Sequence, residues 1–228
     1  MMRGVQRGLP CPLTLILTFK LKSRTDCYRS PIMAVHSGDR EHWNRIALIT
    51  ALAERHYGNY ALYCELTDQP QQAEQWRKNL NKVWEYLAGQ LNSMKNLEKA
   101  LLSMDELTPE PTDEDGYGVY PAQDACLLLT SALQMILDNS IDDVETACGL
   151  SLQTVAQFVA FSQELELDDA MDNPVVQVHP LYLQEVALQQ QLHELLQQAG
   201  NTTELVKQLR RELREYDCSN LGIELPPG

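Results

Sequence analysis

The sequence predicts a single all-α domain, and three observations lead to that prediction. Apolar side chains recur every three or four residues in almost every long segment, which is the spacing of one helix face. No segment alternates apolar and polar residues for long enough to indicate a strand. The chain has 228 residues, of which 44% are hydrophobic, and this is enough to bury one core. We therefore expect a bundle of about seven helices within residues 33–228.

The first part of the bundle is predicted to contain two helices before residue 70. Residues 39–57 place apolar side chains on one helix face. Gly58 and Asn59 are expected to end this helix, because glycine favours the position after a helix and asparagine can cap the next one. A short second helix is then expected over residues 60–67.

Two further helices are expected between Pro70 and the loop at residues 108–116. Pro70 stands at an early helical position that proline favours. Two apolar stripes at helical spacing follow, and the loop after them contains two prolines and a glycine. The stripes consist of Trp76, Leu80, Val83, Trp84 and Leu87, and then of Leu97, Ala100, Leu101, Met104 and Leu107.

The helix that starts near Pro121 is predicted to lie at the centre of the bundle. It is apolar nearly all round as far as Ile136, and a helix without a wide polar face is normally buried. Residues 138–140 interrupt it, and an acidic connector with prolines divides the next two helices. The last three helices are expected over residues 141–166, 181–200 and 202–216.

Charge is distributed unevenly along the chain. The formal net charge is −14, whereas residues 100–206 hold nineteen acidic residues and no lysine or arginine. Residues 1–33 hold six basic residues and one acid, and acids balance bases in residues 34–99 and 207–228. The excess negative charge therefore lies within residues 100–206.

An acidic surface of this extent excludes some classes of binding partner by charge repulsion. It repels the phosphates of nucleic acids and of anionic membranes, so we expect neither to be a partner. Basic proteins and cations are compatible with it. The simpler interpretation is that the acids only keep the protein soluble.

Residues 1–32 differ from the rest of the chain, because they are basic and lack helical periodicity. A signal peptide is the alternative, but the apolar run at residues 13–19 is short and no small-residue cleavage site follows it. The run is also too short to span a bilayer. We interpret the segment as an over-extended translation start, disordered or loosely attached, before a domain that begins near Met33. The six cysteines show neither disulfide nor zinc spacing, which fits a reducing compartment.

The first candidate site is residues 117–126, with the sequence YGVYPAQDAC. Tyr117 and Tyr120 flank a turn that enters the central helix, and Asp124 lies in the first turn of that helix. Aromatic rings, free helical N–H groups and a carboxylate can form the lip of a pocket. The structural alternative is that Asp124 complements the helix dipole and that the tyrosines pack with their hydroxyl groups outward.

The second candidate site is the corner expected within residues 54–64. It contains Tyr57, Asn59 and Tyr60 together with His56. His56 can serve as an acid, a base or a ligand. The alternative is an ordinary surface or capping histidine.

The sequence contains no recognised catalytic or metal-binding motif. It has no H-E-x-x-H, no Glu-x-x-His pair as in di-iron bundles, no G-x-S-x-G and no glycine-rich phosphate loop. The five histidines are scattered, and abundant acids are not in themselves a metal site. We therefore assign no catalytic residue, metal or cofactor, and whether the protein is an enzyme stays open.

Four basic residues form a stripe on one face of the last predicted helix, opposite its leucines. We expect the leucines to pack and the basic stripe to point outward. One hypothesis is that the stripe docks on the acidic surface of residues 100–206, in the same chain or in a second copy. The alternative is a solvated face with local pairs such as Arg211 with Glu215. The basic stripe consists of Lys207, Arg210, Arg211 and Arg214.

These segments also carry a family resemblance. Residues 54–64 and 117–126, with LRRELRE at 209–215 and SNLGI at 219–223, resemble the YjaG-like family of uncharacterised gamma-proteobacterial proteins. The resemblance spans roughly residues 38–223. It implies a cytoplasmic all-α protein and brings no known reaction, cofactor or catalytic residue.

Two functions therefore compete. The sequence favours an interaction or regulatory module whose acidic surface binds a basic protein or a second copy of the chain. The alternative is an enzyme or small-ligand-binding protein with a tyrosine-rich pocket near residues 54–63 and 117–124. Convergence of the tyrosines and Asp124 on one cavity favours the second function, and their dispersal favours the first.

Overall fold

The computed structural model confirms the all-α prediction. It describes residues 37–112, 115–198, 202–216 and 218–224, so the expectations for residues 1–32 lie outside the described residues. Apart from an isolated bridge between Cys218 and Glu224, these residues contain no β-structure. The helices are α1 (Ser37–Leu66), α2 (Pro70–Leu87), α3 (Met94–Leu107), α4 (Val119–Leu137), α5 (Val144–Ser162), η1 (Ala170–Asp172), α6 (Pro174–Gln177), α7 (Pro180–Gln198) and α8 (Thr203–Arg214).

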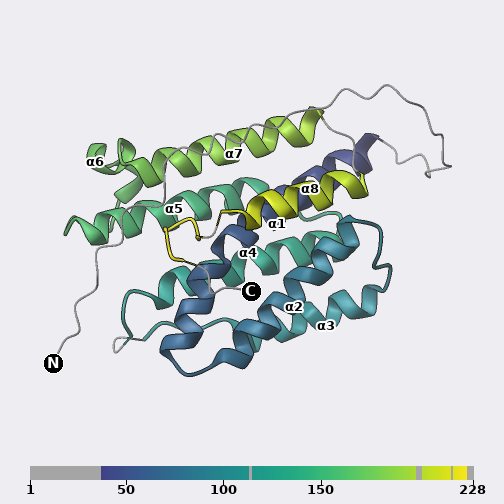
Figure 1. Cartoon of the computed structure of the whole chain (residues 1–228), viewed down its shortest axis with the longest axis horizontal. Helices are drawn as coiled ribbons and strands as arrows, with labels where there is room; N and C mark the ends of the chain where they lie inside the picture. Colours follow the sequence, from purple (N-terminus) through teal and green to yellow (C-terminus); the bar gives the residue numbers. More distant parts are fainter. Residues whose placement is uncertain (1–36, 113–114, 199–201, 217, 225–228) are drawn as a thin grey trace.

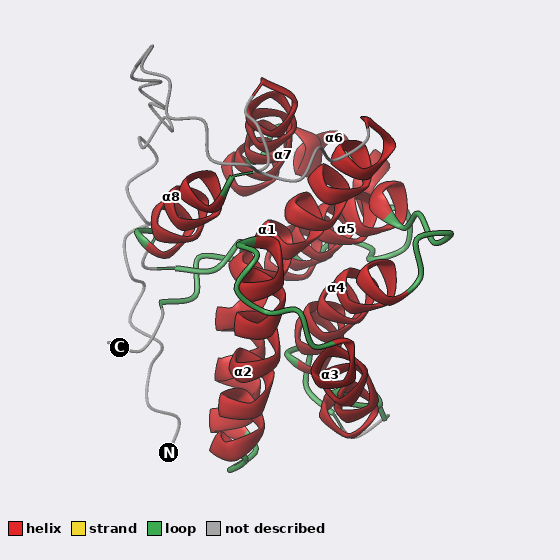
Figure 2. Cartoon of the chain, turned by 90° about the vertical axis from the view of Figure 1, so that its right-hand side faces the viewer, coloured by secondary structure: helices red, strands yellow, loops and turns green. Residues whose placement is uncertain are grey.

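Helices α1 and α4 pack against each other at the centre of the fold (Figure 1). Helix α4 buries side chains around most of its circumference, as its apolar sequence predicts. It shares the central position with α1, which also contacts α2, α5, α7 and α8. Helices α2 and α3 cover one side of this pair, and α5 and α7 run side by side on the other (Figures 1 and 2).

Helix α1 runs unbroken through Gly58 and Asn59, so the predicted division into two helices is wrong. Both residues are buried, and Asn59 donates a hydrogen bond to Asn220 Oδ1 at 2.9 Å instead of capping a helix. Tyr60 is also buried and donates its hydroxyl group to the carbonyl of Leu107 at 2.7 Å. Burial of this face outweighs the poor helix propensity of glycine and asparagine, which costs only about 1 kcal/mol per residue.

The core consists of two clusters of buried side chains. The larger cluster joins α1 to α4 with parts of α7 and α8, and it contains Trp76 and Trp84 of the stripe predicted on α2. The smaller cluster joins the second half of α5 to η1, α6 and Leu221 near the C-terminus. This smaller cluster fixes the acidic connector between α5 and α7 on the body of the protein.

Helix α8 crosses α1 and α2, with its leucines buried beneath it. The hydroxyl group of Thr202 caps its first turn by accepting a hydrogen bond from the N–H of Leu205 at 3.1 Å. After α8 the chain returns to α1, where Arg55 donates to the carbonyl of Cys218 at 2.6 Å. The amphipathic sequence of α8 thus places its basic stripe beside α1 and α2. None of the described helices is long and apolar enough to cross a bilayer.

Candidate functional site

Tyr117 and Tyr120 form a packed aromatic patch with α5. The ring of Tyr117 stacks on Phe161 with centroids 4.3 Å apart, and it lies 6.2 Å from Tyr120 and 6.3 Å from Phe158. Tyr120 and Phe161 are 46% and 52% exposed. Because the rings contact one another, they present a surface patch between α4 and α5.

Asp124 forms a contact between α4 and α5. It accepts a hydrogen bond from Thr154 Oγ1 at 2.7 Å. Burial raises the pKa of Asp124 to about 6, and the hydrogen bond from Thr154 offsets part of that rise. The pKa of Tyr117 is raised as well, first by burial and then by the charge of Asp124. A carboxyl group with this pKa changes its charge close to neutral pH.

His56 is fully buried, so the expectation of a surface or capping histidine is wrong. Its Nε2 lies 2.9 Å from Asn220 Nδ2 and 3.0 Å from Ser151 Oγ. Burial lowers the pKa of His56 to about 3, and the charge of Arg55 adds to the effect. The imidazole is therefore neutral at physiological pH.

The polar network of His56 extends to α7. Ser151 donates to Glu185 Oε1 at 2.6 Å, and Gln189 donates to the same oxygen at 3.2 Å. His56 and Ser151 are 0% exposed and Glu185 is 2% exposed. These are the residue types of a hydrolase triad, but the carboxylate contacts the serine instead of the histidine. The network joins α1, α5 and α7, and its histidine, serine and glutamate are buried.

Glu54 is a buried carboxylate on α1 that pairs with arginines of two other helices. The sequence analysis did not assign it this role. Arg77 of α2 pairs with Glu54 Oε1, and Arg214 of α8 donates to the same oxygen at 3.1 Å. Trp84 Nε1 donates to Glu54 Oε2 at 2.7 Å. Burial alone would raise the pKa of Glu54, but the charges of Arg77 and Arg214 and the hydrogen bonds hold it below its ordinary value. The ion pairs tie α8 to α1 and α2.

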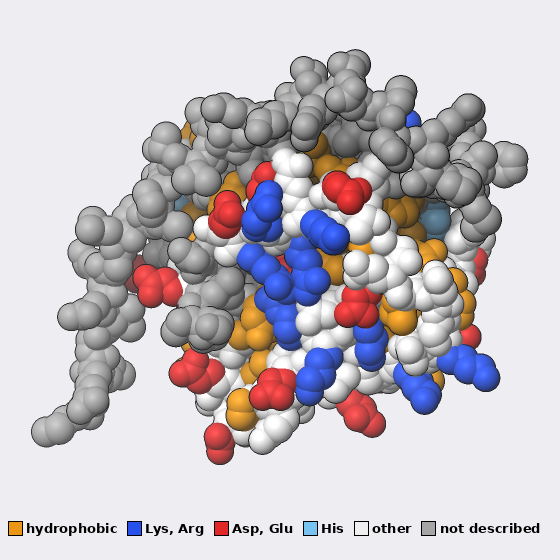
Figure 3. All heavy atoms as spheres, turned by 45° about the vertical axis from the view of Figure 1, so that its right-hand side comes forward, with side chains coloured by type: hydrophobic (Ala, Val, Ile, Leu, Met, Phe, Trp, Pro, Cys, Tyr) orange, Lys and Arg blue, Asp and Glu red, His pale blue; other side chains and the backbone are white. Residues whose placement is uncertain are grey.

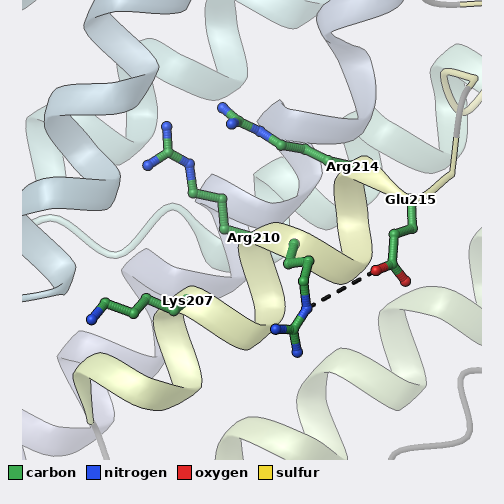
Figure 4. A pocket seen from close by; sticks show the side chains of 5 residues that line it. Lys207, Arg210, Arg214 and Glu215 are labelled. Atoms are coloured by element: carbon green, nitrogen blue, oxygen red, sulfur yellow. Dashed lines mark ion pairs between the residues drawn. The ribbon is translucent and has the colours of Figure 1, made fainter. Parts of the chain in front are cut away.

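The basic stripe is divided by these contacts. Arg210 and Arg214 both donate to Asn81 Oδ1 of α2, Arg214 at 3.3 Å. Within the chain these two residues therefore contact α1 and α2, and the hypothesis that they dock on residues 100–206 of the same chain is wrong for them. Arg214 is nevertheless exposed, as expected for the stripe. Figure 4 shows Arg210 and Arg214 extending to one side of α8.

Arg211 follows the local pairing expected for it. Its Nε lies 4.0 Å from Glu215 Oε1, and both side chains are exposed. A hollow of about 480 Å³ runs along the stripe, lined by its four basic residues and by Glu215 (Figure 4). In Figure 3, lysine and arginine side chains gather in a band across the middle of the visible face, with acidic side chains around it. The basic stripe of α8 therefore lines an open hollow at the surface.

The tyrosines of the two candidate corners lie on different parts of the molecule. Tyr57 and Tyr60 stack on Trp76 of α2, with ring centroids 5.5 and 5.8 Å away. Tyr117 and Tyr120 face α5 instead. A hollow of about 360 Å³ beside Tyr57 has neither Tyr117 nor Tyr120 among its lining residues. Among the described residues no group of three or more histidine, cysteine or acidic side chains has the geometry to hold a metal ion.

These features define an all-α protein with buried polar networks and charged surfaces. The chain belongs to the family described as "Protein of unknown function (DUF416)", whose sequence profile matches residues 39–224. It is 31% identical over 187 residues to the uncharacterised protein YjaG of Escherichia coli, covering 80% of this chain and 91% of that protein. An uncharacterised Haemophilus influenzae protein is 29% identical over 186 residues, covering 81% of this chain and 92% of that protein. The crystal structure of a DUF416 family protein from Shewanella baltica matches with a TM-score of 0.71 at 30% identity, covering 84% of this chain and all of that one.

Proposed function

We propose that this protein is an interaction module whose acidic surface binds a basic protein segment. One observation supports the proposal: between α5 and α7, large apolar side chains are exposed among carboxylates in a stretch without any lysine or arginine. Phe161, Val175 and Val178 are 52%, 52% and 70% exposed, and Leu167 is 38% exposed. We call this the connector surface. Its exposed acids are Glu164, Glu166, Asp168, Asp169 and Asp172.

The connector surface rests on a fixed base. Ala170 and Val176 are buried in the smaller core cluster with Val155 and Val159 of α5. The side chain of Asn173 caps α6 by accepting a hydrogen bond from Val175 at 2.9 Å. The exposed apolar groups are therefore held in place between the acids, and little ordering is needed before a partner binds.

The chemistry of the connector surface favours one class of partner. Exposed apolar groups gain by leaving water, and the exposed carboxylates of the same stretch attract cations. A segment that combines leucine-like residues with lysine or arginine, such as a basic amphipathic helix, satisfies both requirements. The dispersal of the tyrosine corners supports binding over catalysis, because Tyr57 and Tyr60 stack on α2 whereas Tyr117 stacks on α5. We further infer a cytoplasmic location, supported by the reduced thiols of Cys64, Cys126 and Cys148.

The proposal is tested by affinity capture from a native lysate of the source cells. The wild-type chain is compared with the triple variant Glu166→Gln/Asp168→Asn/Asp172→Asn, which removes three exposed acids and keeps their size. We expect a basic protein to bind the wild-type chain, to be released at high salt, and to be lost with the variant. With that protein purified, calorimetry is expected to show about tenfold weaker binding for the variant, from about 0.5 kcal/mol for each exposed charge.

The matched control is the variant Glu65→Gln/Glu74→Gln/Glu98→Gln, which removes three exposed acids outside residues 100–206. The control is expected to bind the same protein as the wild type within about twofold. Equal loss in both variants would show a general effect of net charge, and capture of only a second copy would show self-association. Either result, or no partner at all, contradicts the proposal.

A further inference from the structure

The surface of α8 has more positive charge than its contacts with the rest of the chain require. Three guanidinium groups, of Arg77, Arg210 and Arg214, gather around the single buried carboxylate of Glu54. Arg210 reaches Asn81, which is neutral, and Glu85 is the other negative charge that acts on Arg210. Lys207 and Arg211 also line the hollow along α8, where Glu215 pairs with Arg211. An anion in contact with this face would offset the excess.

The cations of this cluster repel one another. The pKa of Arg210 is lowered by burial and then by the charges of Arg214 and Arg77, with Glu54 and Glu85 acting in the opposite direction. The Nε of Arg210 is also buried without a hydrogen-bond partner, although a buried N–H group normally has one. The cluster therefore has both an unbalanced charge and an unused donor. Guanidinium groups offer paired N–H donors that match the oxygens of a phosphate.

Space for a ligand lies next to these donors. The hollow of about 480 Å³ along α8 falls within the usual range of small-molecule sites. The side chains of Arg211 and Arg214 on its lining are 68% and 43% exposed. Figure 4 shows Lys207 and Arg210 on one side of α8 and Glu215 on the other. A molecule with two or more phosphate groups can reach several of these side chains at once.

The remaining charge of the protein limits the size of the anion. The formal net charge is −14, and a long polyanion such as a nucleic acid would extend from α8 over acidic surface. A small anion stays close to the basic cluster, because salt screens charges farther away than about 8 Å. We propose that the basic face of α8 binds a phosphate-bearing small molecule of metabolite size. This site is separate from the connector surface and does not depend on it.

The test uses inorganic pyrophosphate as the probe and the full chain as the protein. Calorimetry is expected to show saturable binding of pyrophosphate that is tighter than binding of inorganic phosphate. The test variant is Lys207→Gln/Arg211→Gln, because neither residue contacts Glu54 and α8 keeps its anchor. We expect this variant to bind pyrophosphate at least about tenfold more weakly, as loss of two direct contacts implies. The matched control, Lys95→Gln/Lys99→Gln on α3, removes the same charge from exposed positions and is expected to change the affinity less than about twofold.

A second measurement needs no variant. Pyrophosphate is expected to protect Lys207 of the wild-type chain from an acylating reagent, read by mass spectrometry, and to leave Lys95 unprotected. No saturable binding up to about 10 mM pyrophosphate, where even a weak site would fill, would overturn the proposal. So would equal weakening in both variants, equal protection of both lysines, or tighter binding of a short DNA or RNA duplex than of pyrophosphate.

Discussion

Acid should destabilise this protein through His56, and the structure sets the size of the effect. The pKa of His56 is lowered from 6.5 to about 3 by burial and by Arg55. In the unfolded chain the imidazole takes up a proton below about pH 6.5, whereas in the folded chain it stays neutral until about pH 3. The free energy of unfolding therefore falls as the pH drops through this window. Between pH 7 and pH 5 the loss from His56 is about 2 kcal/mol.

The assay is urea unfolding at several pH values, for the wild type and for His56→Gln. Other titrating groups contribute equally to both proteins, so the difference between the two curves isolates His56. The variant keeps an acceptor for Asn220, and the wild type is expected to lose about 2 kcal/mol more than the variant between about pH 7 and pH 5. Parallel curves would refute the reasoning. So would an NMR titration in which the His56 ring of the folded protein protonates near its ordinary pKa.

Three further predictions concern other buried groups. The change Asp124→Asn should raise the free energy of unfolding near pH 7 by about 2 kcal/mol, because burial raises the pKa of Asp124 to about 6. This gain should vanish below about pH 4, where the carboxyl group is protonated in both states. An unchanged free energy of unfolding at neutral pH would contradict the prediction. The change Glu54→Gln should lower the free energy of unfolding by about 3 kcal/mol, because two guanidinium groups lose their counter-charge. The control Glu98→Gln on the surface should change it by less than about 0.5 kcal/mol. Equal effects of the two changes in urea unfolding would show that Glu54 does not stabilise the packing of α8. The thiols of Cys64 and Cys126 are buried with raised pKa values, so native-state labelling followed by mass spectrometry should be slow and track unfolding, and rapid labelling would show access to the core.

Local sequence patterns identified most of the helices, because helical periodicity is a local property. The stripe with Trp76 and Trp84 predicted both the existence of α2 and the face that it buries. The apolar surround of α4 predicted its central position. The prediction failed at Gly58 and Asn59, where turn-forming residues lie in the middle of a 30-residue helix. Burial of Gly58 and Asn59 against residues distant in the chain keeps the helix continuous there, and a local sequence pattern cannot predict such burial.

The contacts of the buried polar residues could not be predicted from local sequence patterns either, because their partners are distant in the chain. The sequence singled out His56 and offered a functional and a surface interpretation. It could not predict the burial of His56, because its contact with Ser151 spans 95 positions of the chain. Glu54 was included in a candidate segment, but its pair with Arg214 spans 160 positions. Whether a histidine titrates and whether a glutamate anchors a helix depend on such contacts. The basic stripe was located by its spacing alone, while its division between anchoring and exposed residues required the fold.

The anchoring of α8 also bears on the acidic half of the protein. If the basic stripe had docked on residues 100–206, part of the negative charge there would be neutralised within the chain. Instead Arg214 pairs with Glu54 of α1, and Arg210 reaches Asn81 of α2. Arg45 pairs with Asp142, at the other end of α5 from the connector surface. None of the ion pairs among the described residues involves the carboxylates between α5 and α7, which lie in the same stretch as exposed apolar groups. We propose that a basic amphipathic partner recognises this combination.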